Sequence, residues 1–263
     1  MRDSTMKTFL ITGGTSGIGE GVTKYFLEAG NRVIVVSRNK GNLPNAIYLQ
    51  ADLSLASENY RIIEYIKNTY GAIDGLILCA VLQTARKEAL ITQEGLEFTF
   101  ALQYLSRYIL SNQLAFNDDS FILNVAAPGI YSPINFDDLE YRSKFNSLKA
   151  NANANRLNDL LGVAFKRKGV RYILYSPMAV RTAGARSVFS NPLMKIFLRV
   201  VHRLVGHEVH EIVDRIVEVL QESSSQSFSA YSLSKPVDLS KKTFDPQKAK
   251  QLEAITKKIL LNV

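Results

Sequence analysis

The chain contains little of what disulfides and metal sites require. Its 263 residues include a single cysteine, Cys79, and only three histidines. One cysteine excludes an internal disulfide, and the histidines have neither paired cysteines nor the HExxH spacing that zinc sites use. The sequence therefore predicts no bound metal.

Long hydrophobic runs are also missing. The apolar runs at 33–36 and 76–81 are much shorter than the roughly 20 residues of a membrane-spanning helix, and residues 1–4 lack the apolar stretch of a secretion signal. No stretch rich in proline, glycine and serine divides the chain. We therefore expect one cytoplasmic domain that covers residues 1–263.

The chain is basic, with 32 Lys and Arg residues against 24 Asp and Glu residues and a net charge of +8. Such a balance can serve binding to nucleic acid or to an anionic membrane. Here the basic residues are spread along the chain, and no nucleic-acid-binding module is recognisable. We expect no nucleic-acid partner, and a positive surface also attracts a phosphorylated cofactor.

Short runs of apolar and β-branched residues alternate with helical patterns along the chain. The predicted strands are 9–12, 32–37, 46–50, 75–79, 121–125, 171–175 and 227–233. The predicted helices are 18–29, 56–70, 93–112, 142–167 and 209–222. Because parallel strands require crossover connections, this alternation predicts an α/β domain with a doubly wound parallel sheet, the Rossmann fold.

Two regions fall outside the alternation, residues 182–206 and the charged tail that begins at Asp245. Ligands of a doubly wound sheet bind beyond the carboxyl ends of its strands, so an insertion after the sixth strand would lie over that crevice. Residues 182–206 are therefore a candidate lid or insertion on the substrate side. The alternatives are an amphipathic helix packed on the body and, because of Lys195, Arg199 and Arg203, a helix that lies on a membrane surface.

Residues 12–19, which read TGGTSGIG, form the clearest local motif. They follow a predicted strand and open a predicted helix, which is the context that a phosphate-binding glycine loop needs. The glycines permit a tight turn and close approach of a pyrophosphate, and the N-terminus of the helix offers free N–H groups. The predicted contacts of this loop with a dinucleotide are Gly13, Thr15, Ser16, Gly17, Ile18 and Gly19.

The end of the second predicted strand bears on the choice between NAD and NADP. An acidic residue there would bind the ribose hydroxyls of NAD, whereas an arginine would pair with the 2′-phosphate of NADP. Residues 36–39 read VSRN and contain no carboxylate. They favour NADP(H), with Ser37 and Arg38 as contacts, and Asp52 and Leu53 after the third strand are suitably placed for the adenine ring.

These motifs, together with SPMAVRT at 176–182 in place of a PGxVxT segment, resemble the short-chain dehydrogenase/reductase family over nearly the whole chain. INFDDLE at 134–140 and the lysine-rich C-terminal helix resemble its retinol-dehydrogenase-like branch.

The resemblance implies a ketone, aldehyde or alcohol substrate under the region after Thr182. It also implies a homodimer or tetramer through the helices at 93–112 and 142–167, although the polar exposed side of the second helix disfavours tight association. The further cofactor contacts that it implies are Ala80, Lys149, Pro177, Val180 and Thr182.

Most of the catalytic residues that the resemblance implies are replaced. The family uses a tyrosine as general acid/base, a lysine four residues later, a serine that polarises the substrate oxygen and an asparagine in the proton relay. Lys149 is retained and Phe145 stands at the tyrosine position. Ala126 and Ala127 stand at the serine positions, and Gln103 replaces the asparagine. Phenylalanine has no proton to give, and alanine cannot donate to a developing alkoxide.

These losses should slow carbonyl reduction. General acid/base groups contribute roughly 10²- to 10⁴-fold in rate, and an oxyanion donor contributes about 10²- to 10³-fold. LCAV at 78–81 also replaces the family's NNAG, which costs structural hydrogen bonds. Tyr141 would lie one helical turn before Phe145 if the helix already includes it, which makes Tyr141 the candidate replacement acid.

Two functions remain open. The first, which the sequence favours, is an NADP(H)-binding protein of this fold without the standard alcohol/ketone chemistry: a sensor, a partner subunit, or a catalyst whose reaction needs no protein acid. The second is a working NADPH-dependent oxidoreductase on a small carbonyl, alcohol or conjugated substrate, with Tyr141 as its acid. The resemblance does not decide between them, because function resides in the site.

Overall fold

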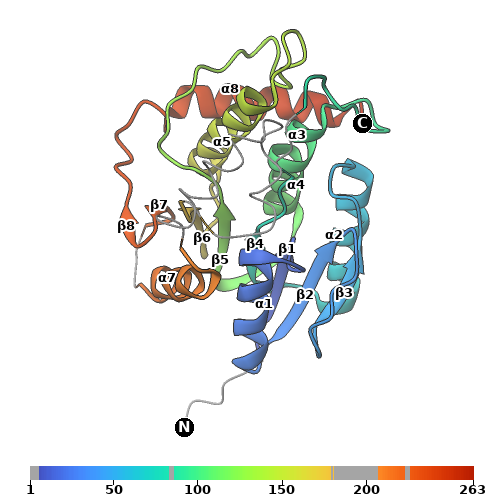
Figure 1. Cartoon of the computed structure of the whole chain (residues 1–263), viewed down its shortest axis with the longest axis vertical. Helices are drawn as coiled ribbons and strands as arrows, with labels where there is room; N and C mark the ends of the chain where they lie inside the picture. The colour runs from blue at the N-terminus through green and yellow to red at the C-terminus, as the bar shows by residue number, and fades with distance from the viewer. Residues whose placement is uncertain (1–5, 83–85, 179, 181–206, 223–225) are drawn as a thin grey trace, which may run out of the picture.

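A computed structural model of the chain describes residues 6–82, 86–178, 180, 207–222 and 226–263 (Figure 1). They form one eight-stranded sheet in the order β3-β2-β1-β4-β5-β6-β7-β8, in which only the β7–β8 pair is antiparallel. The strand order reverses between β1 and β4, so the sheet is doubly wound, as predicted. The strands are β1 (Thr8–Thr12), β2 (Arg32–Ser37), β3 (Ile47–Gln50), β4 (Ile73–Leu78), β5 (Phe116–Val125), β6 (Val170–Ser176), β7 (Phe228–Ser232) and β8 (Lys235–Pro236).

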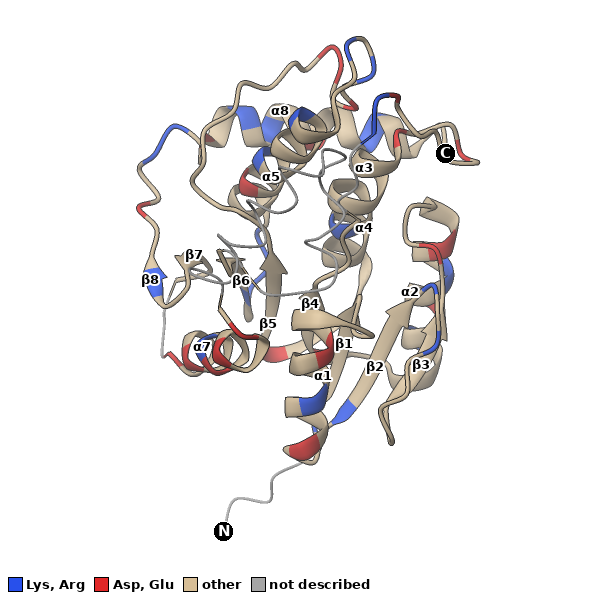
Figure 2. Cartoon of the chain, viewed as in Figure 1, with Lys and Arg blue, Asp and Glu red and all other residues tan. Residues whose placement is uncertain are grey.

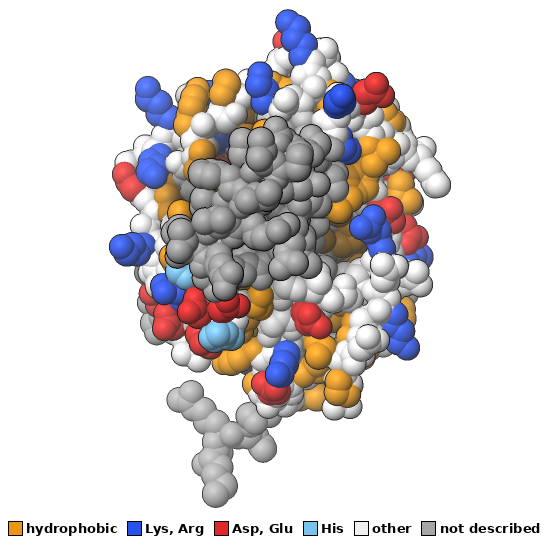
Figure 3. Space-filling model, in the orientation of Figure 1, with side chains coloured by type: hydrophobic (Ala, Val, Ile, Leu, Met, Phe, Trp, Pro, Cys, Tyr) orange, Lys and Arg blue, Asp and Glu red, His pale blue; other side chains and the backbone are white. Residues whose placement is uncertain are grey.

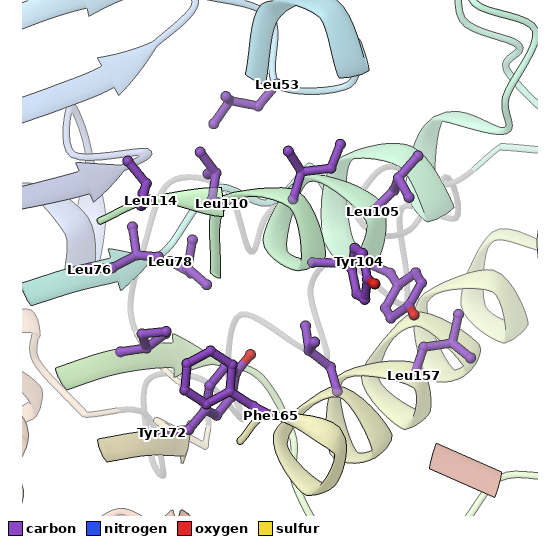
Figure 4. Packing of buried hydrophobic residues seen from close by; sticks show 14 of the residues in the cluster. Leu53, Leu76, Leu78, Tyr104, Leu105, Leu110, Leu114, Leu157, Phe165 and Tyr172 are labelled. Carbon is purple, nitrogen blue, oxygen red and sulfur yellow. The ribbon is translucent and has the colours of Figure 1, made fainter. Parts of the chain in front are cut away.

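Helices cover both faces of this sheet. On one face α1 and α7 pack together, and Phe26 and Ile212 belong to the same buried cluster. On the other face α2, α4 and α5 enclose a larger cluster, in which Leu78, Leu110 and Leu157 come from a strand and two helices (Figure 4). The helices with a predicted counterpart are α1 (Gly17–Glu28), α2 (Ala56–Tyr70), α3 (Phe98–Phe100), η1 (Ala101–Leu105), α4 (Ser106–Gln113), α5 (Ser147–Ala164) and α7 (Val209–Gln221). No helix formed by the described residues has both the length and the apolar character of a membrane span.

The seven predicted strands are all present, but β5 starts at Phe116, five residues before its predicted start. The helix predicted at 93–112 begins only at Phe98 and is divided into α3, the π-helical turn η1 and α4. It begins there because Glu97 is its N-cap and accepts the N–H group of Phe100 at 2.9 Å. The Glu94 carboxylate instead accepts the N–H groups of Ala56 and Ser57, at 2.5 and 2.9 Å, and thereby caps α2.

The helix predicted at 142–167 is also shorter, since α5 spans Ser147–Ala164. Before it, the Asp138 carboxylate accepts the N–H groups of Arg142 and Ser143, at 2.8 and 2.9 Å, and holds these residues in a turn. Asn146 then caps α5. The prediction that the helix begins at Arg142 is therefore wrong.

The charged tail forms a further helix, α8 (Pro246–Leu260), which packs across α5 (Figure 1). Asp245 caps it, and Pro246 occupies its first position, where a missing N–H costs nothing. Its buried Thr256 lies with its hydroxyl 2.6 Å from the Tyr104 hydroxyl of η1. Part of the surface of η1 and α5, through which we expected a homodimer, is thus covered by the chain's own C-terminal helix.

Charge is spread unevenly over the described residues. Asp and Glu gather along α7, whereas Lys and Arg lie at many points from α1 to α8 (Figure 2). The dispersed basic positions agree with their spread along the sequence.

Candidate cofactor-binding and active site

The glycine loop brings three backbone segments into direct contact. Gly13 has φ +69°, and its N–H donates to Val36 O at 2.9 Å. A Cβ at Gly13 would lie 2.9 Å from Ala80 Cα, and a Cβ at Gly19 would lie closer still to Gly13 O. Only glycine fits at these two positions without rearrangement. The turn from β1 into α1 is therefore as tight as a dinucleotide loop requires.

The N-terminus of α1 faces this loop. Ser16 is its N-cap and makes no side-chain capping hydrogen bond. Ser16 is exposed, and Thr15, Gly17 and Ile18 are half-buried. Because the N–H groups of a first helical turn have no partner within the helix, and Ser16 supplies no acceptor, this end of α1 is suited to an anion.

The end of β2 carries a cation and no carboxylate. The Ser37 hydroxyl donates to Asn39 O at 2.6 Å, and Gln50 Nε2 donates to Arg38 O at 2.8 Å. These bonds fix the backbone after the strand, while the Arg38 side chain is exposed. A guanidinium in this position is available to a phosphate.

Asp52 and Leu53 follow β3 and differ in exposure. Asp52 Oδ1 accepts from the N–H and the hydroxyl of Ser54, at 3.0 and 2.7 Å, in a turn that leads into α2. Leu53 is buried in the core (Figure 4). Asp52, which is half-buried, is the member of the pair that presents side-chain surface where we expect adenine.

β4 ends beside the glycine loop. The N–H groups of Cys79 and Ala80 donate to the carbonyl and the hydroxyl of Thr12, at 3.1 and 3.2 Å. Desolvation raises the pKa of the Cys79 thiol to about 12, so the thiol stays protonated and unreactive at neutral pH.

Behind these residues lies Arg107 of α4, which the sequence analysis missed. Its side chain is buried, its Nη1 donates to Asn124 Oδ1 and Val125 O, and its Nη2 donates to Ala80 O. The guanidinium thus joins the ends of β4 and β5 and supplies hydrogen bonds where the NNAG side chains are missing. The available signal was an arginine one turn after Gln103 in an otherwise apolar stretch.

α5 carries Lys149 in its first turn, where Asn146 Oδ1 accepts the N–H groups of Leu148 and Lys149, both at 3.1 Å. The Lys149 side chain is exposed. Phe145 precedes the helix, and Tyr141 lies in a loop with φ +57°. The helical turn that was expected to relate Tyr141 to Phe145 does not exist, so that basis for a replacement acid is wrong.

A second arginine, Arg86, packs against Phe145, the residue at the tyrosine position. Its guanidinium lies over the Phe145 ring, and its backbone N–H donates to the Ser147 hydroxyl at 3.2 Å. Its Nη2 donates to Glu97 Oε1 at 3.2 Å and to Thr99 Oγ1 at 2.6 Å. The segment after β4 is thereby tied to the start of α5.

The serine and asparagine positions offer few groups to a substrate. Ala126 and Ala127 follow β5 and are half-buried. Gln103 is buried in the π-helical turn, and its Nε2 donates to Asn151 Oδ1 at 2.9 Å. Its backbone carbonyl accepts from Asn158 Nδ2 at 2.8 Å. The side-chain NH₂ group of Gln103 therefore has a partner within the protein.

The segment after β6 is described only in part. Pro177 is half-buried, and Val180 is buried and forms a parallel bridge with His207. Thr182 and the predicted lid at 182–206 lie outside the described residues.

With this geometry in view, comparison with known proteins shows what the chain resembles. Residues 7–120 match the family model described as short chain dehydrogenase. This match covers less than half of the chain, and over these residues the chain is similar to short chain dehydrogenases. Short chain dehydrogenases bind a nicotinamide cofactor, and the glycine loop between β1 and α1 lies within the matched residues.

Several known proteins are similar to this chain, most of them over part of its length. An uncharacterised oxidoreductase of Saccharomyces cerevisiae is 34% identical over 108 residues, which are 40% of this chain and 35% of that protein. Zerumbone synthase of Zingiber zerumbet is 31% identical over 81 residues, 27% of this chain and 30% of that protein. The chain thus matches about a third of the length of these two relatives. L-xylulose reductase of Caenorhabditis elegans is 23% identical over 86% of this chain and 92% of that protein.

Solved structures share the fold over most of its length. An uncharacterised protein of Mycobacterium paratuberculosis has a TM-score of 0.71 at 19% identity, covering 96% of this chain and 92% of that one. The 3-alpha-hydroxysteroid dehydrogenase of Pseudomonas sp. B-0831, complexed with NADH, has a TM-score of 0.64 at 18% identity and covers 87% and 96%.

Proposed function

We propose that this chain is an NADP(H)-binding member of the short-chain dehydrogenase family that lacks the standard alcohol/ketone chemistry. One observation carries the proposal: the chain combines a glycine loop that only glycine fits with the loss of the tyrosine and serine hydroxyls from the four catalytic positions, which we call the tetrad positions. The retinol-dehydrogenase-like branch and the cytoplasmic location stay predictions.

The glycine loop supports the cofactor half of the proposal. The backbone at Gly13, Gly19 and Ala80 packs so closely that a Cβ added at either glycine would collide with it. The N-terminus of α1 beside these residues is suited to an anion. Gly17 and Ser16 would contact the pyrophosphate, Asp52 the adenine, and Lys149 the nicotinamide ribose. When bound, NADPH would supply the hydride for any reduction.

Arg38 supports the choice of NADP(H) over NAD(H). Its exposed guanidinium follows β2, where a carboxylate would repel the 2′-phosphate, and the adjacent Lys40 is exposed as well. A charged, bidentate pair between Arg38 and the phosphate would discriminate between the two cofactors.

The residues at the tetrad positions support a function without general acid catalysis. Phe145 has no exchangeable proton, and Ala126 and Ala127 have no hydroxyl to donate to a substrate oxygen. What remains is an exposed Lys149 to orient the cofactor. A sensor, a partner subunit, or a catalyst that transfers hydride to a conjugated acceptor suits these residues.

Apolar surface near the strand ends supports an apolar ligand. Hydrophobic side chains are visible at several places on the face shown in Figure 3, among polar and charged ones. Exposed apolar residues in the segments after β4, β5 and β6 are Val81, Leu90, Ile91, Ile130, Tyr131 and Met178. Removal of such surface from water favours binding of an apolar small molecule.

The alternative function is an active NADPH-dependent oxidoreductase with a relocated acid. Tyr141 remains the candidate from the sequence, although it lies in a loop outside α5. Activity that depends on its hydroxyl would select this alternative.

Calorimetric titration with NADPH and NADH tests the proposal. We expect NADPH to bind about tenfold tighter or more, because a charged bidentate contact contributes roughly 1.5 to 3 kcal/mol. Arg38→Ala should abolish most of this preference, while Lys24→Ala, which removes one exposed cation from α1, should keep it. Equal binding of both cofactors to the unmodified protein would contradict the NADP(H) assignment.

A further inference from the structure

Arg107 is a buried cation that has no carboxylate partner among the described residues. Arg107 is 4% exposed, yet it takes part in none of the ion pairs among the described residues. The undescribed segments contribute a single acidic residue, Asp3. Burial lowers the pKa of Arg107 to about 10, so the side chain is still charged at neutral pH.

Within the described part of the chain, the groups that contact this charge are neutral dipoles. The guanidinium donates to Val125 O at 2.9 Å, to Ala80 O at 3.3 Å and to Asn124 Oδ1. The Asn124 amide is fixed in this orientation because its Nδ2 donates to Asn158 Oδ1 and to the Tyr172 hydroxyl, at 2.8 and 2.9 Å. In such an environment the field of a cation is weakly screened.

The cation lies directly under the expected cofactor crevice. Arg107 donates to the carbonyl of Ala80 at the end of β4, and Ala80 is in contact with Gly13 of the glycine loop. The residue at the end of β5, Val125, directly precedes Ala126. Ligands of a doubly wound sheet bind outside the carboxyl ends of its strands, where the order reverses between β1 and β4. Arg107 therefore sits between the phosphate loop and the tetrad positions.

We propose that Arg107 makes the site selective for the reduced form of the cofactor. The inference rests on the proposed NADP(H) binding. The nicotinamide ring of NADP⁺ carries a positive charge and that of NADPH is neutral, whereas the phosphates of the two forms are alike. A buried cation near the ring repels the oxidised form alone. The protein should then hold NADPH and release NADP⁺, which suits a sensor of the reduced cofactor or a reductase rather than an alcohol-oxidising enzyme.

Separate titrations of NADPH and NADP⁺ test this inference without any substrate. For the unmodified protein we expect NADP⁺ to bind on the order of tenfold more weakly than NADPH. In Arg107→Met the ratio of the two dissociation constants should fall toward one, mainly through tighter binding of NADP⁺. Arg107→Lys, which keeps the charge, should retain much of the ratio.

Arg171→Met is the matched control. Arg171 is also an arginine held by backbone carbonyls, those of Glu222 and Leu220, but it lies near the amino end of β6. Its loss changes the net charge equally and should leave the ratio unchanged. If Arg107→Met fails to fold, as judged by circular dichroism, Arg107→Gln is the second neutral variant, since its amide can donate to one of the carbonyls.

The outcomes separate this inference from the function on which it rests. Equal affinity of the unmodified protein for NADPH and NADP⁺, or an unchanged ratio in a folded neutral variant, would overturn the role of Arg107 alone. Failure of both forms to bind would overturn the proposed NADP(H) function as well.

Discussion

The guanidinium carbon of Arg86 lies 5.4 Å from the centre of the Phe145 ring. It also lies 5.6 Å from the centre of the Phe98 ring, and its side chain is 17% exposed. An aromatic face attracts a cation, with an energy of about 0.5 to 2 kcal/mol that grows as water is excluded. Phe145 therefore has a role of its own at the tyrosine position, as the platform for an arginine that is anchored on Glu97.

Restoring the tetrad should create carbonyl reductase activity if the substrate pocket survives. In Phe145→Tyr with Ala127→Ser, the new phenol would stand beside Arg86, whose charge should lower the pKa of the phenol and assist proton transfer. We expect any trace rate of NADPH oxidation with simple aldehydes or ketones to rise by about 10²-fold or more. The absence of tryptophan from the chain leaves NADPH fluorescence free of that background.

Phe145→Leu is the control for this variant, because it removes the ring without adding an acid. Rapid carbonyl turnover by the unmodified chain that survives Tyr141→Phe would contradict our interpretation of the tetrad positions. Rapid turnover that is lost in Tyr141→Phe would instead support Tyr141 as the acid.

The strand pattern predicted the sheet because its signals are local. Runs such as Val33 to Val36 are buried on both sides of the sheet, and the glycine loop has a fixed spacing. Helix starts were predicted less well, because they depend on which side chain caps them. Glu94 lies within the helix predicted at 93–112 but caps α2, 37 and 38 residues earlier in the chain. Asn146 carried a usable local signal, as a preferred capping residue two positions before Leu148.

The sequence carried a signal for the position of Arg107, one turn after Gln103, but the contacts of the two arginines of the site could not be predicted from it. Arg107 lies in a helix whose neighbours are apolar, and its partners Ala80 and Val125 act through backbone carbonyls, which leave no pattern of residue types. Arg86 pairs with Phe145 across 59 residues of sequence. Contacts of this kind follow from the tertiary fold alone.

Gly19→Ala should abolish cofactor binding with a moderate loss of stability. The added methyl group would collide with Gly13 O, so the loop must open before the pyrophosphate can approach. We expect at least about tenfold weaker binding of NADPH and a loss of about 1 to 3 kcal/mol in unfolding free energy. Gly30→Ala is the control: its φ is +78° but no atom lies within 4 Å of the added Cβ, so it should reduce stability and leave NADPH affinity intact. Unchanged binding by Gly19→Ala would argue against a phosphate-binding loop.

The hydrogen bond between Tyr104 and Thr256 should hold α8 on the body of the domain. Both residues are buried, with 2.6 Å between their hydroxyl oxygens. Thr256→Val leaves the Tyr104 hydroxyl without this partner and should lower the unfolding free energy by about 1 to 3 kcal/mol. In a double-mutant cycle with Tyr104→Phe, measured by urea denaturation, Thr256→Val should lower the unfolding free energy less when Tyr104 is already replaced than it does alone. Strictly additive losses would show that the bond contributes nothing.

Asp159 should make the stability of the fold fall as the pH rises toward neutrality. The residue is 0% exposed, and burial raises the pKa of its carboxyl from 3.8 to about 7, although Thr243 and Gly129 donate to Oδ2. Between these two pH values the folded chain keeps a proton that the unfolded chain has lost. The stabilisation is therefore fully present below about pH 4 and is lost as the pH rises through about 7, which corresponds to a change on the order of 2 to 4 kcal/mol.

Asp159→Asn tests this linkage, because a neutral amide retains an oxygen to accept from Thr243 and has no charge to desolvate. Its unfolding free energy, measured by urea denaturation from pH 4 to 8, should lack the decline expected of the unmodified chain, and at pH 8 it should be the more stable protein. Asp137→Asn, which removes an exposed carboxylate, is the control for net charge. The decline should be steepest between about pH 4 and 7, because in that window the folded and unfolded chains differ most in bound protons at this position. An identical pH profile for Asp159→Asn and the unmodified chain would mean that the carboxyl titrates alike in both states, and hence that water or a rearranged Arg156 compensates its charge.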